Sequence, residues 1–123
     1  MPGITSFQML RQQRHARWLG DLKERINFLL ARPTQAECVT PDQIYLFGSR
    51  ARGDWDGHSD TDLLVVAENQ ADAEQWVDQL LDKGLAQDAI ALDRKAWKEL
   101  PNHPSVIWRN AVRDALPLLE ERP

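Results

Sequence analysis

Two short apolar segments, Ile44–Phe47 and Thr61–Val66, constrain the fold of this chain more than any other feature. Both have the length of a β-strand, and each is bounded by glycine or aspartate, which are common where strands end. The segments on either side of this pair instead repeat their apolar residues every three or four positions, as amphipathic helices do. A chain that combines these two periods has to pack helices on a small sheet, so we expect an α/β or α+β domain.

The longest helical pattern lies near the N-terminus. Between residues 6 and 31, apolar residues follow one another at steps of 3, 4 and 3: Leu19, Leu22, Ile26 and Leu29. Pro33 and Pro41 then interrupt the pattern and predict a loop. We therefore expect an N-terminal helix and loop over residues 1–40, followed by residues 41–123, within one compact domain overall.

Further elements are predicted beyond the second strand. The segment ADAEQWVDQLLDKG places five apolar residues on one helical face, and Gly84 would end that helix; the five are Ala73, Trp76, Val77, Leu80 and Leu81. The segment Asp88–Asp93 predicts a third strand, and Lys95–Leu100 a short helix. Pro104 suits the first position of another helix, and Pro117 indicates a bend or an edge strand. The resulting order predicts a small mixed sheet flanked by helices.

Composition limits the classes of protein to consider. A chain of 123 residues can build one hydrophobic core. It contains no run near the ~20 apolar residues of a membrane span, and its N-terminus lacks the apolar segment of a signal peptide. The single cysteine, Cys38, cannot form an internal disulfide and fits a reducing compartment. We expect a cytoplasmic protein that does not enter the membrane.

Charge is distributed unevenly along the chain. Residues 1–32 contain six Arg or Lys residues against Asp21 and Glu24, although the whole chain has a net charge of −4. A basic helix can contact nucleic acid or an acidic partner, but a solvated helix face is the simpler interpretation. An acidic chain without a template-binding module is not expected to be a nucleic-acid polymerase.

The turn after the first strand is suited to binding an anion. Gly48 follows the strand directly, and a residue without a side chain lets backbone N–H groups approach an anion closely. Ser49 adds a hydroxyl, and Arg52 lies three residues further on, which is the same side of a helical turn. This turn predicts a phosphate-binding site, although glycine and surface arginines at a turn are also common without any ligand.

Two carboxylates lie at the start of the second strand. Asp60 and Asp62 are two residues apart, so on a strand their side chains point to the same face. Side by side they would repel each other, and a divalent cation removes that repulsion. Oxygen-rich sites suit Mg²⁺, which usually takes substrate phosphates and waters as its other ligands. A metal-bound nucleoside triphosphate would account for both the basic turn and the acidic pair.

Two better-known motifs do not fit the same stretch. In a calcium-binding loop counted from Asp54, Gly57 would occupy the fourth position rather than the sixth, and Val65 would replace the glutamate at the twelfth. A Walker phosphate-binding loop needs Gly-Lys-Ser/Thr, which does not follow Gly48.

The segments GSRARG, beginning at Gly48, and SDTDLL, beginning at Ser59, resemble the signature of the DNA polymerase β-like nucleotidyltransferase superfamily. The short chain is most similar to the minimal nucleotidyltransferase branch. The resemblance implies that the turn binds the triphosphate and that the aspartates hold two Mg²⁺ ions, completed by a third carboxylate on a later strand. It assigns nucleotide binding to Gly48, Ser49, Arg52 and Ser59, and catalysis and metal binding to Asp60, Asp62 and Asp88.

Asp88 competes with Asp93 for the role of third carboxylate. Both border the third strand, but Asp88 shares a face with Ile90 and Leu92, and Asp93 lies on the opposite face. Asp93 also precedes a short helix, where aspartate is a common N-cap. We therefore expect Asp88 to complete the metal site and Asp93 to cap the helix.

The resemblance implies an enzyme that transfers a nucleoside monophosphate, in the first place AMP from ATP, to a hydroxyl group. Minimal nucleotidyltransferases often act as antitoxins that modify HEPN-type RNase toxins, so a partner protein is the expected acceptor. Two alternatives remain: a small-molecule transferase of the antibiotic-modifying type, and a protein that neutralises a partner by contact alone. The chain could also form a homo-oligomer.

Overall fold

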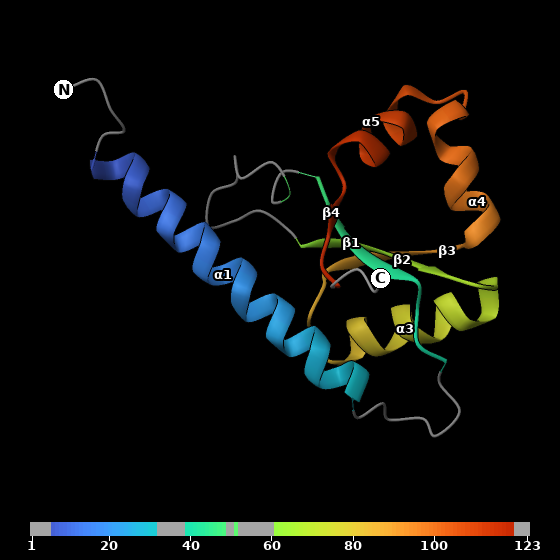
Figure 1. Cartoon of the computed structure of the whole chain (residues 1–123), viewed down its shortest axis with the longest axis horizontal. Helices are drawn as coiled ribbons and strands as arrows, with labels where there is room; N and C mark the ends of the chain where they lie inside the picture. The colour runs from blue at the N-terminus through green and yellow to red at the C-terminus, as the bar shows by residue number, and fades with distance from the viewer. Residues whose placement is uncertain (1–5, 32–38, 49–50, 52–60, 120–123) are drawn as a thin grey trace.

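The computed structural model describes residues 6–31, 39–48, 51 and 61–119. Figure 1 shows how its helices and strands are arranged. In chain order the elements are α1 (Ser6–Ala31), β1 (Gln43–Phe47), β2 (Asp62–Ala67), α3 (Gln70–Asp82), β3 (Asp88–Asp93), α4 (Arg94–Glu99), a 3₁₀ helix (Leu100–Asn102), α5 (Val106–Asp114) and β4 (Leu116–Pro117). The expected α/β class is confirmed.

The strands form one mixed sheet in the order β3-β2-β1-β4. β1 runs antiparallel to β2 and to β4, whereas β2 and β3 are parallel. Parallel neighbours need a crossover connection, and α3 provides it between β2 and β3. Pro117 lies in β4 at the edge of the sheet, where a residue without an N–H is tolerated.

Each face of the sheet carries its own apolar layer, because side chains alternate along a strand. On one face Leu63 and Val65 pack with residues of α1 and α3, among them Ile26 and Trp76. On the other face Leu64 and Val66 of β2 pack against the 3₁₀ helix, α4 and α5. Figure 1 shows α3 and the α4–α5 pair on opposite sides of the sheet. β2 is therefore covered on both faces.

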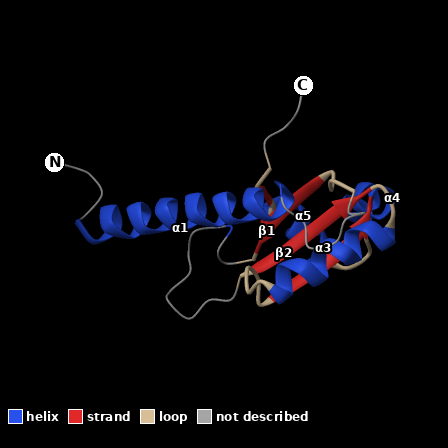
Figure 2. Ribbon diagram, turned by 90° about the horizontal axis from the view of Figure 1, so that it is seen from below, coloured by secondary structure: helices blue, strands red, loops and turns tan. Residues whose placement is uncertain are grey.

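The buried residues of helix α1 all lie in its C-terminal half. Its buried residues are Leu22, Ile26 and Leu29, which belong to the apolar stripe expected from the sequence. The N-terminal half extends past the sheet, as Figure 2 shows. There Phe7 is 86% exposed. Among the described helices, none is both long enough and apolar enough to cross a bilayer.

Two details differ from the expectations. Leu81, assigned to the buried face of α3, is 41% exposed. It lies roughly 100° around the helix from the centre of the buried stripe, at about 100° per residue, so it falls on the flank. Pro104 does not open the last helix, because α5 begins at Val106 with Ser105 as its N-cap. The backbone N–H of Ser105 instead donates to His103 Nδ1 in the preceding turn, at 2.9 Å.

Candidate functional site

Three residues of the expected site meet at one end of the sheet. Gly48 follows the last residue of β1, Asp62 opens β2, and Asp88 opens β3. The register places Phe47 opposite Asp62 and Asp62 opposite Asp88. Because β1 is antiparallel to β2, the end of the first strand and the starts of the other two lie together.

Asp62 and Asp88 project from the same face of the sheet. Asp62 lies on the same face of β2 as Leu64 and Val66, and Asp88 lies on the same face of β3 as Ile90. These three apolar residues belong to the layer beneath α4 and α5. Residues paired in register on neighbouring strands are about 4.8 Å apart along the hydrogen-bonding direction. The two carboxylates are therefore neighbours at the rim of that apolar layer.

Gly48 lies against the Asp62 carboxylate. Its φ is +79°, in the left-handed region that favours glycine. A Cβ atom built on Gly48 would lie 3.1 Å from Asp62 Oδ2. Both the backbone conformation and the close contact with Asp62 therefore favour glycine at this position, and the turn after β1 lies against the first residue of β2.

Gln87 holds the backbone beside these carboxylates, a role that the sequence did not indicate. The N–H of Thr61 donates to Gln87 Oε1 at 2.5 Å. The Thr61 carbonyl accepts the backbone N–H groups of Gln87 and Asp88, at 3.0 and 3.3 Å. Thr61 is buried, with 6% of its surface exposed. Gln87 could not be identified from the sequence, because a polar residue just before a predicted strand is common and does not indicate such a contact.

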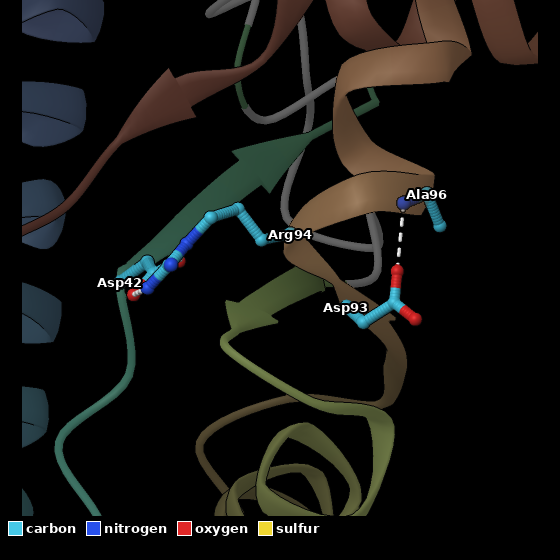
Figure 3. Close-up of polar contacts among 4 residues, drawn as sticks. All are labelled: Asp42, Asp93, Arg94 and Ala96. Atoms are coloured by element: carbon cyan, nitrogen blue, oxygen red, sulfur yellow. Dashed lines mark hydrogen bonds and ion pairs between the residues drawn. The ribbon is translucent and has the colours of Figure 1, made fainter.

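Asp93 lies at the end of β3 opposite to Asp88 and caps the next helix. Its Oδ1 accepts the backbone N–H of Ala96 at 2.7 Å, which is the N-cap bond of α4 shown in Figure 3. The expectation that Asp93 caps the helix is confirmed. Asp88, by contrast, is exposed at the start of the strand. Its assignment as the third carboxylate remains a prediction.

The ion pair in Figure 3 also lies away from Asp62 and Asp88. Arg94 Nε and Nη2 donate to the two carboxylate oxygens of Asp42 at 2.8 and 3.0 Å. These hydrogen bonds hold the pKa of Asp42 below its ordinary value and raise that of Arg94. Asp42 precedes β1 and Arg94 follows β3. This perturbed pair therefore fastens the far end of the sheet.

The rest of the expected site lies outside the described residues: Ser49, Arg52, Ser59 and Asp60. Within the ranges that the structure describes, no group of three or more His, Cys, Asp or Glu side chains is placed to hold a metal ion. Asp62 and Asp88 nevertheless fit such an ion in chemistry, since carboxylate oxygens are the protein ligands that Mg²⁺ takes. Their in-register placement gives a cation two donors from different strands.

The family model described as "Polymerase beta, Nucleotidyltransferase" matches residues 34–118, a span that includes Gly48, Asp62 and Asp88. No curated protein matches the chain. Among solved structures, the crystal structure of a candidate nucleotidyltransferase from Sulfolobus solfataricus is similar at 25% identity, over 95% of this chain and 89% of that one, with a TM-score of 0.49. Since the family model covers more than half of the 123 residues, the chain belongs to the polymerase β nucleotidyltransferase family.

Proposed function

We propose that the protein is a Mg²⁺-dependent nucleotidyltransferase that moves AMP from ATP to a hydroxyl group. The observation that carries the proposal is the row formed by Asp62 and Asp88, paired in register on one face of the sheet beside Gly48. Such a row places carboxylates beside a glycine turn whose backbone N–H groups can donate to phosphate oxygens. A Mg²⁺ ion could then bind carboxylate and phosphate oxygens together. The family match supports nucleotidyl transfer in general.

The proposed roles are phosphate binding, assigned to the turn after β1, and metal binding, assigned to the aspartates. Gly48 and Ser49 would receive the triphosphate, with Arg52 and Ser59 binding its oxygens. Asp60, Asp62 and Asp88 would hold two Mg²⁺ ions, and the register of β2 and β3 pairs Asp62 with Asp88. Bound ions would neutralise the phosphates and lower the pKa of the attacking hydroxyl. Arginine and backbone N–H groups would stabilise the charge that develops on the departing pyrophosphate.

The acceptor hydroxyl is proposed to belong to a partner protein, with a HEPN-type RNase toxin as the expected class. Support comes from the resemblance of the chain to minimal nucleotidyltransferases, and the match to the polymerase β nucleotidyltransferase family agrees with it. Transfer to such a partner would make the protein an antitoxin by modification.

Incubation with ATP labelled at the α-phosphate tests the reaction directly. The purified protein is mixed with cell extract and Mg²⁺, and a parallel reaction contains Asp62→Asn. Label on a protein band supports the proposal, and label on RNA would show tailing instead. Label on a small molecule would indicate an antibiotic-type transferase. No transfer, with label equally absent from wild type and Asp62→Asn, favours a protein that neutralises its partner by contact.

A further inference from the structure

We infer that Gln87 is a positioning residue that sets the direction of the metal-binding carboxylates. The inference rests on the proposed function, because it concerns how the same site is held. Its basis is the backbone of Thr61, which stands between Asp60 and Asp62 and is tied to the start of β3 through Gln87.

The amide side chain of Gln87 takes the place of a missing main-chain group. In a parallel pair, a residue's N–H donates to a carbonyl of the neighbouring strand. β3 begins only at Asp88, so the strand does not continue far enough to supply that carbonyl for Thr61. Gln87 Oε1 accepts the N–H instead, at 2.5 Å. The side chain thereby extends the pairing of β2 and β3 by one step.

This extra step lies beside the carboxylates. Asp62 pairs with Asp88 in the first regular register position, and Thr61 and Gln87 form the next pair outward. The direction in which Asp62 leaves the sheet depends on the peptide plane that joins it to Thr61. The Thr61 carbonyl belongs to that plane and accepts the backbone N–H groups of Gln87 and Asp88, whereas the Thr61 N–H, bonded to Gln87 Oε1, belongs to the peptide plane on the other side of Thr61. The two contacts together restrict the backbone that leads into Asp62. The same contacts fix Asp88, whose own N–H donates to the Thr61 carbonyl.

Loss of the Gln87 acceptor would leave a buried N–H without its partner. Thr61 is only 6% exposed, so replacing the lost bond requires the backbone to move toward water. Gln87 itself is exposed, and its replacement removes no core side chain. We therefore expect a Gln87 variant to fold normally but to hold the carboxylates loosely.

The test uses Gln87→Met, which keeps the length of the side chain and removes the acceptor. Affinity for Mn²⁺ with α,β-methylene-ATP, a non-reactive ATP analogue, is measured by electron paramagnetic resonance, and hydrogen exchange of the Thr61 amide is measured without metal. We expect roughly tenfold weaker Mn²⁺ binding and at least roughly tenfold faster exchange, the scale of one lost hydrogen bond. Gln87→Glu, which keeps the acceptor, should restore slow exchange.

Asn69→Ala is the matched control. It removes another hydrogen bond that a backbone N–H donates to a side-chain amide oxygen: the N–H of Asp72 donates to Asn69 Oδ1 at 2.9 Å, at the start of α3. Mn²⁺ binding should stay within about twofold of the wild type in this variant. Unchanged Mn²⁺ affinity in Gln87→Met, with a wild type that binds normally, would overturn the inference alone. A wild type that binds no Mn²⁺ with the analogue would overturn the proposed function as well.

Discussion

Gly48 shows how a single backbone conformation can prepare a site. Its positive φ and its closeness to Asp62 Oδ2 act together, because a side chain at this position would strain the turn and push on the carboxylate. We predict that Gly48→Ala lowers the free energy of unfolding by about 1 kcal/mol and also weakens Mg²⁺-dependent ATP binding. Denaturant unfolding and titration calorimetry measure the two effects separately.

Gly84 provides the control for this prediction. It also has a positive φ, +70°, but a Cβ atom added there would meet nothing within 4 Å. Gly84→Ala should therefore have a similar cost in stability and leave ATP binding unchanged. Equal losses of ATP affinity in the two variants would mean that strain alone, and not the contact with Asp62, explains the effect at Gly48.

The two aspartates of β3 should separate catalysis from stability. Asp88→Asn should abolish nucleotidyl transfer without unfolding the protein, because Asp88 is exposed and opens the strand beside Asp62. Asp93→Ala should remove the N-cap bond to Ala96, lower the free energy of unfolding by about 1 kcal/mol, and retain transfer. Transfer assays and thermal unfolding of both variants decide the matter, and an active Asp88→Asn with a folded but inactive Asp93→Asn would reverse the assignment.

At the scale of elements, periodicity accounts for what the sequence could predict. The bounds of α1 and β3 agree with the expected ones, and β1, β2 and α3 differ by only a residue or two. The helices have an apolar repeat of three or four residues, and the strands are short apolar segments bounded by glycine or aspartate. Strand pairing could not be obtained this way, since the repeat along β2 is the same whether its neighbour is parallel or antiparallel. The contact between Gln87 and Thr61 follows from that pairing, so it too required the structure.

The ion pair between Asp42 and Arg94 joins two elements and should make stability depend on pH. Hydrogen bonding to Arg94 lowers the pKa of Asp42 in the folded protein, and its ordinary value is 3.8. A lowered folded pKa means that the stabilisation is complete above 3.8 and is lost as the pH falls through the folded pKa. Urea unfolding should therefore show a larger difference between wild type and Asp42→Asn at pH 7 than at pH 3.

The Arg94→Gln background provides the control for this pH dependence. Without the guanidinium, Asp42→Asn should have nearly the same small effect at both pH values. The pair is partly exposed, with side-chain exposures of 50% for Arg94 and 32% for Asp42, so solvent and salt should weaken the effect. A difference that persists unchanged at pH 3 in the wild-type background would contradict the assignment to this pair.

At the scale of the molecule, the two apolar layers explain which parts of the chain can be substituted or removed without unfolding the protein. β2 is enclosed by both layers, whereas the first three turns of α1 contain no buried residue. The carboxylate row lies at the strand starts, at the rim of one layer, so the core supports the site without covering Asp88. Stability should therefore depend on the C-terminal half of α1 and very little on its N-terminal half.

Removing residues 1–14 tests this division. Residues 6–14 are exposed throughout, so the deletion should change the melting temperature by no more than about 3 °C. Ile26 is fully buried, and Ile26→Ala should cost about 3 kcal/mol through the cavity that it leaves, lowering the melting temperature by roughly 10 °C or more. Leu10→Ala, on the same helix but 49% exposed, should resemble the wild type. Calorimetry measures all three variants, and a deletion as damaging as Ile26→Ala would show that the N-terminal half of α1 is needed for the folded state.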